Sequence, residues 1–520
     1  MIRFEIKSDC PRIINNKHWQ FCVGSGQAKL ALRTDYAKSL KKVHDELGIQ
    51  RVRFHGIFDD SMQAYMGLDD FMPLPGSQSF KNYNFRNIGI AYDNVLAAGM
   101  QPWVEMSFMP SRLAKGKKKV TVNSDGRCTM PKDDNEWKDF IQAFIRFLLH
   151  RYGEEEIHQW FFEVWNEPNM STFFNGTMQD YFHLYEITAR AIKEVDPEIK
   201  VGGPASATGA WITEFIDFCE GRQLPLDFIS THNYPGDGIG EVFLGKIMFD
   251  SIVGGMKRLK QIGRGRALDG CQAMMQDKSE IDAMPKGQMY QHTKTVNEQV
   301  AGRYPIYYTE WNCNAILTSP TNDMKKVACF QTKSISEMDR FVTGSSIWCF
   351  SDIFDEFLMF PDQFSGGFGL LTIDGIPKPQ YYALQLMNRT GDRKYDLPYT
   401  NDEVEISAYE GKDEIMVFVY RQQMKNSGAP ALDYEVSLEI KKAPESVTCV
   451  KIDDENGNPL KKWNDMGKPY EMNEDEIVAF IQETKPTERP VEIIFENGKI
   501  LLSDALKVND THCYIIKNAV

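Results

Sequence analysis

Eight short β-rich runs alternate with amphipathic stretches between about residues 20 and 390 of the 520-residue chain. Between the runs, apolar residues recur at three- and four-residue spacing, which indicates helices that bury one face. Eight such alternations predict a (β/α)8 barrel. A doubly wound sheet is the alternative, but it would carry a glycine-rich phosphate loop after its first strand, and Gly24-Ser25-Gly26 lacks the third glycine. The runs begin at Phe21, Arg51, Gln101, Phe161, Lys200, Phe228, Tyr304 and Ser345.

The pattern of the chain changes after about Tyr382, where apolar and polar residues alternate with period two. Turn signals separate these runs, among them Glu455-Asn456-Gly457 and Asn497-Gly498. The opening residues MIRFEIKS have the same pattern, so we expect them to join the same sheets. The predicted domains are a catalytic barrel over residues 15–390 with an insertion around 236–302, and an accessory all-β sandwich made of residues 1–14 and 391–520.

Acidic residues outnumber basic ones by 73 to 59, which gives a formal net charge of −14. Nucleic acids and anionic membranes favour basic partners, so we expect neither as a partner. No segment reaches the roughly 18 apolar residues that span a bilayer. The ten cysteines are scattered singly and form no CxxC pair, which disfavours a zinc site. We expect a cytoplasmic protein with reduced thiols, although a signal peptide removed earlier would leave the same N-terminus.

Two long connections stand out in the predicted barrel. Residues 110–132 follow the third strand, and a loop at that position lies on the catalytic face of a barrel. Residues 236–302 are too long for a simple loop and helix. They are a lid, an oligomer contact or an irregular insertion, and the sequence leaves these alternatives open, as it does the formation of a homo-oligomer.

Two glutamates stand at the ends of predicted strands, where a barrel builds its active site. The fourth strand ends Trp165-Asn166-Glu167-Pro168, and the seventh ends Thr309-Glu310-Trp311-Asn312. Glycosidic cleavage needs one protonated carboxyl group for the leaving oxygen and one carboxylate for the anomeric carbon. In a retaining enzyme the two groups lie about 5–5.5 Å apart, and Asn166 would bind the sugar 2-hydroxyl. A single glutamate at a strand end is more often a salt-bridge partner, so the prediction depends on the pair.

Four further segments accompany the two glutamates: RFHG at Arg53–Gly56, THNY at Thr231–Tyr234, WCFSD at Trp348–Asp352 and GGFGLL at Gly366–Leu371. With them, the chain resembles glycoside hydrolase family 39 of clan A, the family of β-xylosidases and α-L-iduronidases. The resemblance covers the barrel nearly end to end. It implies that Glu167 is the acid/base, that Glu310 is the nucleophile, and that an accessory β-sandwich takes up the N-terminal strand.

The same resemblance implies a set of substrate-binding residues. Asn166 matches the contact to the 2-hydroxyl, His55 a histidine that binds the nonreducing sugar, and Tyr234 a tyrosine near the nucleophile. Read without the family, the histidines and Trp348 would be structural residues and the acidic pair would be solvated loop charges. The remaining matches are His232 beside the active site, Trp348 as a platform under the sugar, Phe108 as an aromatic wall, and Asp355 with Glu356 as an acidic pair that enforces exo action.

The residue at position 234 bears on the substrate. Iduronidases resemble this segment but carry a lysine there, so Tyr234 favours a neutral sugar, and xylose is the commonest neutral substrate of the family. Ser365 replaces a histidine usual in β-xylosidases, and residues 120–129 replace an aromatic-rich segment. β-Glucosidase, β-galactosidase and arabinose-releasing activities therefore stay open, as does a noncatalytic carbohydrate-binding barrel. The expected partner is an oligosaccharide, and no metal or organic cofactor is implied.

Overall fold

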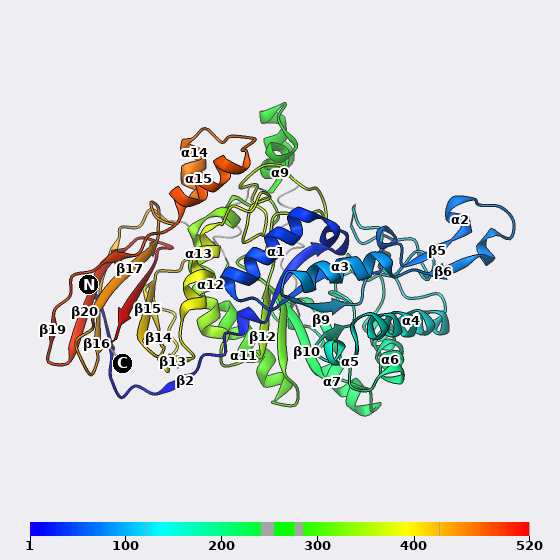
Figure 1. Ribbon diagram of the computed structural model, residues 1–520, viewed down its shortest axis with the longest axis horizontal. Helices are drawn as coiled ribbons and strands as arrows, with labels where there is room; N and C mark the ends of the chain where they lie inside the picture. The colour runs from blue at the N-terminus through cyan, green and yellow to red at the C-terminus, as the bar shows by residue number, and fades with distance from the viewer. Residues whose placement is uncertain (122, 241–253, 276–283, 426, 519–520) are drawn as a thin grey trace.

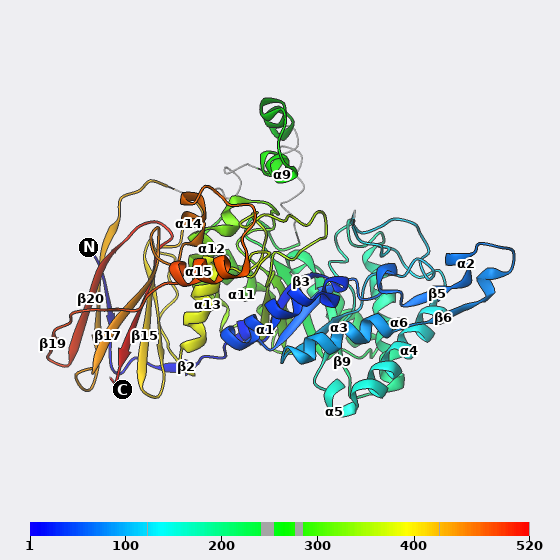
Figure 2. The same ribbon diagram turned by 45° about the horizontal axis from the view of Figure 1, so that its top comes forward.

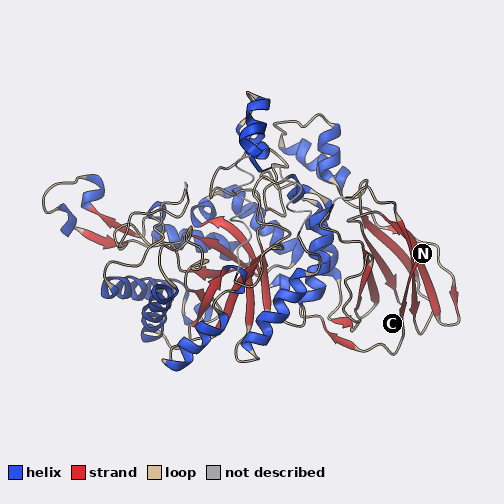
Figure 3. Ribbon diagram, turned by 180° about the vertical axis from the view of Figure 1, so that it is seen from behind, coloured by secondary structure: helices blue, strands red, loops and turns tan. Residues whose placement is uncertain are grey.

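A closed, eight-stranded parallel barrel forms the centre of the molecule (Figures 1 and 3). The computed structural model describes residues 1–121, 123–240, 254–275, 284–425 and 427–518. All eight strands coincide with the predicted runs, and β12 pairs with β3 to close the ring, so the predicted (β/α)8 barrel is confirmed. The strands are β3 (Cys22–Gln27), β4 (Arg51–His55), β7 (Gln101–Glu105), β8 (Phe161–Glu163), β9 (Lys200–Ser206), β10 (Phe228–Asn233), β11 (Ile306–Trp311) and β12 (Gly344–Ile347).

Helices surround the barrel and bury one face each. In α4, for example, Trp137, Phe140, Ile141 and Phe144 are buried at three- and four-residue spacing, and the Asp133 side chain caps the first turn. These helices hold the strands in place and leave the strand ends to the loops. The main helices are α1 (Thr34–Leu47), α3 (Arg86–Ala97), α4 (Asp134–Tyr152), α6 (Met178–Val195), α7 (Ile212–Gly221), α11 (Gln288–Val300), α12 (Lys325–Met338) and α13 (Pro379–Arg389).

Aromatic side chains close the barrel at the starts of its strands. Trp103, Phe161, Phe228 and Tyr307 form one buried cluster, and the partly buried Phe21 packs against it. The rings of Trp103 and Phe161 stack at 4.9 Å. Because this end is filled with apolar rings, a polar site can form only at the opposite, carboxyl end of the strands.

Two packed β-sheets form the accessory region and include strands from both ends of the chain (Figure 1). β1 pairs in parallel with β16, and β2 lies at the edge of the other sheet. The domain boundaries at residues 14 and 390 stay a prediction. The first sheet holds β1 (Ile2–Ile6), β16 (Leu432–Glu439), β20 (Lys499–Leu506) and β19 (Phe495–Glu496); the second holds β18 (Arg489–Pro490), β17 (Ser446–Ile452), β21 (Thr511–Lys517), β15 (Glu414–Tyr420), β14 (Glu405–Glu410), β13 (Arg393–Tyr395) and β2 (Arg12–Ile14).

Two helices, α14 (Pro459–Asp465) and α15 (Glu474–Thr484), interrupt the accessory sheets, where the sequence predicted strands alone. The Asn497-Gly498 signal does form a hairpin, since Glu496 pairs with Lys499. Both turn residues have positive φ, as a two-residue hairpin turn requires. The Asn456-Gly457 signal does not form the predicted hairpin, because the chain runs from there into α14.

The helix pair joins the accessory region to the barrel. Trp463 of α14 and Phe480 of α15 pack with Phe364 and Ile376, which belong to the connection after β12. The contact therefore supports the barrel loops that follow the last strand.

The predicted insertion of residues 236–302 contains both a barrel helix and an added segment. α11 packs against α7 and α12 and occupies the helix position between β10 and β11. α9 (Ala267–Met275) stands apart from the barrel (Figure 2). Residues 241–253 and 276–283 lie outside the described part of the chain, so the predicted alternatives for this insertion stay open.

Two features noted in the sequence can be compared with the structure, namely the scattered cysteines and the lack of long apolar segments. All ten cysteines lie within the described residues, and none forms a disulfide. Among the helices that the structure describes, none is both long enough and apolar enough to cross a bilayer.

Candidate active site

The two predicted carboxyl groups meet at the carboxyl end of the barrel. Glu167 lies in the connection after β8, and Glu310 lies near the end of β11. Both are buried, with exposed fractions of 7% and 5%. One oxygen of each glutamate lies within 4.8 Å of the other and of a nitrogen of His232. This spacing suits a direct attack on a sugar carbon better than the 6.5–9.5 Å that would admit a water between them.

The backbone bends sharply to bring Glu167 over the mouth. Trp165 and Glu167 have φ values of 76° and 43°, in the left-handed region that non-glycine residues rarely adopt. The Glu167 amide donates to the Ala205 carbonyl at 2.8 Å, and the Trp165 indole donates to the Phe173 carbonyl at 3.0 Å. Such strain costs on the order of 1–3 kcal/mol per residue and typically occurs at functional sites.

A buried arginine, Arg53 of β4, holds the Glu310 side of the site. Its Nη1 donates to Glu310 Oε1 at 2.8 Å, and its Nη2 donates to Asn166 Oδ1 at 2.9 Å. Glu163 and Glu105 also pair with it, at 2.6 and 2.8 Å. Burial lowers the pKa of Arg53, but the carboxylates outweigh burial and raise it. A permanent positive charge therefore touches Glu310.

His55, two residues further along β4, adds a second positive charge. Its Nδ1 lies 2.6 Å from Glu105, and its Nε2 lies 3.3 Å from Glu356 and 3.5 Å from Glu310. Burial lowers the pKa of His55, but these carboxylates, Glu105 first, raise it to about 9. Burial raises the pKa of Glu356 to about 7, against the effect of His55. At neutral pH the imidazole is therefore protonated.

The two central glutamates thus have unequal surroundings. Burial raises the pKa of Glu310, whereas Arg53 and His55 lower it. Burial and then the charge of Glu310 raise the pKa of Glu167 well above its usual range. Because Arg53 contacts Glu310 directly, the pair holds its first proton on Glu167. The arrangement provides one carboxylate and one carboxylic acid whose nearest oxygens lie within 4.8 Å of each other.

Two residues at the end of β10 connect the pair. His232 Nδ1 lies 2.9 Å from Glu167 Oε1, and the Tyr234 hydroxyl donates to Glu310 Oε2 at 3.1 Å. Burial, followed by Arg53 and His55, lowers the pKa of His232 well below its usual value, so this imidazole is neutral. Although Glu167, His232 and Glu310 converge closely enough to surround a cation, hydrogen bonds already occupy their facing atoms. We therefore interpret the cluster as a site for proton transfer.

The predicted aromatic residues lie beside the same charged cluster. The Trp348 ring lies 4.7 Å from the His55 ring and packs with Tyr234. The Phe108 ring lies 6.1 Å from His55 and 5.6 Å from Trp165. These rings form apolar walls beside the charged groups.

The two acidic residues of the predicted pair have different partners. Glu356 contacts His55, as described above. Asp355 instead forms an ion pair with Lys29 at 3.1 Å, and burial raises its pKa. Glu356 is therefore part of the charged cluster, whereas Asp355 links the loop after β12 to the segment after β3.

Several polar residues of the site were missed from the sequence. Arg53, Glu105, Glu163 and Thr309 are buried charged or polar residues within barrel strands. That placement is itself a signal, because a buried charge needs partners. Some buried polar atoms at the carboxyl ends of strands have no hydrogen-bond partner within the described structure, and these suit the hydroxyl groups of a ligand: both amide atoms of Gln27, both amide atoms of Asn233, and Asn166 Nδ2.

The loop of residues 110–132 borders the site, as its position after the third strand predicts. Asp59, after β4, accepts hydrogen bonds from the Ser124 hydroxyl at 2.7 Å and the Phe108 amide at 3.3 Å. Burial raises the pKa of Asp59 to about 6. Lys118 donates to the Ser171 carbonyl at 2.6 Å. The loop is thereby tied to the connections after β4 and β8.

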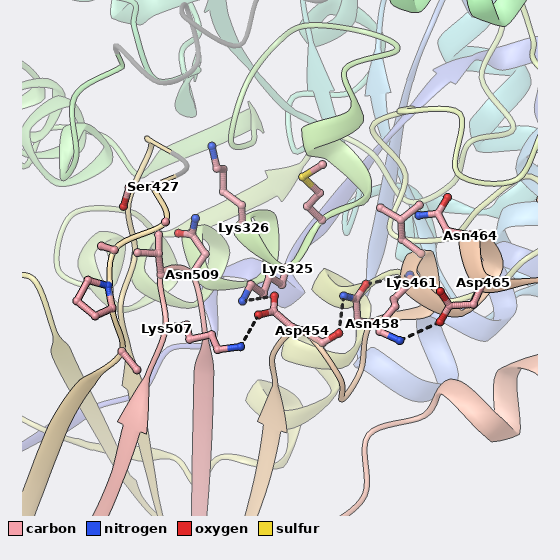
Figure 4. A pocket seen from close by; sticks show the side chains of 17 residues that line it. Lys325, Lys326, Ser427, Asp454, Asn458, Lys461, Asn464, Asp465, Lys507 and Asn509 are labelled. Carbon is pink, nitrogen blue, oxygen red and sulfur yellow. Dashed lines mark hydrogen bonds and ion pairs between the residues drawn. The ribbon is translucent and has the colours of Figure 1, made fainter.

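A separate cavity of about 750 Å³ lies between α12, α14 and residues 427–431 (Figure 4). Three of the lysines that line it, Lys325, Lys461 and Lys507, are paired with acidic neighbours. Asp454 lies 2.6 Å from Lys325 and 3.1 Å from Lys507, and Asp465 lies 2.8 Å from Lys461. Because these charges compensate one another, we interpret the cavity as a gap in the packing between the barrel and the accessory region rather than as a second reaction site.

The chain as a whole is similar to known proteins. A family model described as glycosyl hydrolases family 39 matches residues 2–264 and 269–499. The chain belongs to glycosyl hydrolase family 39. Two relatives, both β-xylosidases, support the assignment to this family: that of Caldicellulosiruptor saccharolyticus is 35% identical over 97% of this chain and 96% of its own. That of Geobacillus stearothermophilus is 33% identical over 91% of this chain and 86% of its own.

The fold of this family 39 chain also resembles solved structures. A family 39 β-xylosidase from Caulobacter crescentus superimposes with a TM-score of 0.74 at 25% identity and covers 99% of both chains. The chain is therefore a β-xylosidase-like glycoside hydrolase that acts on a carbohydrate, as the sequence predicted. The individual roles of its site residues stay predictions.

Proposed function

We propose that this protein is a retaining exo-β-glycosidase that releases xylose from the nonreducing ends of short oligosaccharides. The observation that carries the proposal is the pair of buried glutamates, whose oxygens lie within 4.8 Å and whose partners differ in charge. A retaining mechanism needs this combination of short separation and unequal acidity.

The reaction proceeds in two displacements. In the first, Glu310, kept ionised by Arg53 and His55, attacks the anomeric carbon while Glu167 gives its proton to the leaving oxygen. The product is a glycosyl ester on Glu310 and a free alcohol. In the second, the Glu167 carboxylate takes a proton from water, and the resulting hydroxide oxygen displaces Glu310. The sugar leaves with its original anomeric configuration.

The choice of sugar is supported by three observations. Both full-length relatives named above are β-xylosidases. Tyr234 bonds to Glu310 and offers no cation for a uronic carboxylate. Glu356 and His55 provide a charged hydrogen-bonding pair for the outer hydroxyls of a terminal sugar. Ser365, where β-xylosidases usually have histidine, keeps other neutral sugars among the outcomes to be tested.

The test is a panel of 4-nitrophenyl glycosides: β-xyloside, β-glucoside, β-galactoside and α-L-arabinoside. We expect the highest kcat/KM for the β-xyloside and a product that is initially the β-anomer by NMR. An initial α-anomer would exclude the retaining mechanism. A preference for another glycoside would change the substrate and leave the mechanism intact. Binding of xylo-oligosaccharides without any turnover in the panel would favour the noncatalytic alternative.

A further inference from the structure

A chain of buried hydrogen bonds reaches Glu167 from inside the barrel. Glu163 Oε1 lies 2.8 Å from Thr309 Oγ1, and Thr309 Oγ1 lies 3.1 Å from His232 Nε2. His232 Nδ1 lies 2.9 Å from Glu167 Oε1. His232 and Glu163 are fully buried, and Thr309 is 2% exposed, so solvent does not compete for these bonds.

The direction of each bond follows from the number of protons available. Glu163 Oε2 accepts from the Arg53 guanidinium, and Oε1 accepts the hydroxyl proton of Thr309. A threonine hydroxyl has only one proton. Thr309 Oγ1 must therefore accept at its other contact, so His232 Nε2 carries the proton there.

The imidazole of His232 is neutral, because burial disfavours its charged form. With its single proton on Nε2, Nδ1 is a bare acceptor that faces Glu167 Oε1. The bond between them then requires a proton on the Glu167 carboxyl group. Within the described structure, the other titratable and charged groups around Glu167 and His232 include Glu310, whose Oε2 lies 3.7 Å from His232 Nδ1, and also Arg53, His55, Tyr234 and Asp237.

We propose that Thr309 is a positioning residue that holds His232 in the Nε2–H tautomer and thereby keeps the acid proton on Glu167. The proposal rests on the proposed function, in which Glu167 is the acid/base.

The Nε2–H tautomer of His232 favours the protonation state that Glu167 needs in each of the two displacements. Before the first, it favours the protonated form of Glu167, which the leaving oxygen needs. After the proton has left, the Glu167 carboxylate faces the lone pair of Nδ1 and receives no hydrogen bond from it. The carboxylate is therefore a stronger base, and it removes a proton from the incoming water more readily. The proton balance is unchanged, because His232 neither gains nor loses a proton in the cycle.

The test replaces Thr309 with valine, which removes the hydroxyl group and keeps the side chain's shape. Without Thr309 Oγ1, His232 can carry its proton on Nδ1 and donate it to the Glu167 carboxylate. That bond would stabilise the ionised form and lower the pKa of Glu167. We expect the basic limb of the kcat/KM–pH profile to move down by about one pH unit. Thr309→Ser should restore the limb.

A matched control separates this effect from loss of a buried hydroxyl group. Thr188 on α6 is also buried; it accepts from the Trp137 indole at 2.8 Å and lies outside the active site. Thr188→Val should reduce stability without moving the basic limb. An unchanged basic limb in Thr309→Val would overturn the proposal.

A measurement on the wild-type protein does not depend on the folding of any variant. The ¹⁵N shifts of histidine-labelled protein, assigned with His232→Gln, report which ring nitrogen carries the proton. We expect a protonated Nε2 in the free enzyme; a protonated Nδ1 would overturn the proposal. If the wild type hydrolyses no glycoside, the proposed function fails, whereas the tautomer is still read from the spectrum.

Discussion

The two sides of the barrel mouth place the same residue type, glutamate, in opposite electrostatic surroundings. On the Glu310 side, Arg53 donates directly to the carboxylate and a protonated His55 lies 3.5 Å away. On the Glu167 side, the only direct side-chain partner that the described structure gives is the neutral His232. The difference shows that burial alone does not decide how readily a carboxyl group ionises. Burial raises the pKa of both glutamates, and the neighbouring cations decide which one ionises first.

The largest effect is expected on the Glu310 side, from Glu310→Gly. If Glu310 is the nucleophile, as proposed, its removal should lower kcat by at least about 10⁴-fold, because the glycosyl ester can then no longer form on it. Added azide should restore turnover on an activated aryl glycoside and give a glycosyl azide of inverted configuration by NMR. An azide product of retained configuration would assign the nucleophile elsewhere.

On the other side, Glu167→Ala should have an effect that depends on the leaving group. We expect a loss of about 10²–10⁴-fold on xylobiose, whose leaving alcohol needs a proton. The loss on 2,4-dinitrophenyl β-xyloside should be much smaller, because that leaving group departs without one. Initial rates on both substrates provide the measurement. Equal losses would contradict the assignment of Glu167 as the acid.

Removing the Arg53 cation should make the surroundings of Glu310 and Glu167 more alike. In Arg53→Gln, the direct positive partner of Glu310 is lost, so the pKa of Glu310 rises. Because Glu310 must be ionised to attack, the acidic limb of the kcat/KM profile should move to higher pH by at least about one unit. The basic limb, which reports Glu167, should move less. Thermal unfolding is the control, since a broken buried ion pair also destabilises the fold by about 3–5 kcal/mol. A shift of the basic limb alone would contradict the comparison.

The smallest effect is expected from Tyr234→Phe. The variant loses one hydrogen bond to the Glu310 carboxylate and keeps the ring. Hydrogen bonds to charged groups contribute about 1.5–3 kcal/mol, so kcat/KM should fall by at least about tenfold. A rate equal to wild type would remove Tyr234 from the group that tunes Glu310.

The sequence predicts the strands and strand ends that position this site better than it predicts the ion pairs within it. Eight alternating runs located every barrel strand, and the strand-end positions of Glu167 and Glu310 marked them as the central pair. Arg53 lay within a recognised segment, yet its contacts depend on barrel register. That register brings residues 105, 163 and 310 to one guanidinium, and local patterns contain no such information.

Two helices of the accessory region had sequence signals of their own. Asn458-Pro459 and the pair Asn473 and Glu476 are helix-start patterns, and both precede helices where strands were expected. The pairing of Asp355 with Lys29, by contrast, joins loops more than 300 residues apart and leaves no trace in either segment.

The N-terminal strand has a consequence for how the protein is made. β1 finds its partner in β16, which begins at Leu432. At typical rates of synthesis of about 5–20 residues per second, the first residues wait roughly 20–90 s for that partner to be synthesised. The barrel strands are complete well before then. The first strand can therefore take its place at the edge of its sheet only after all eight barrel strands and β16 have been synthesised.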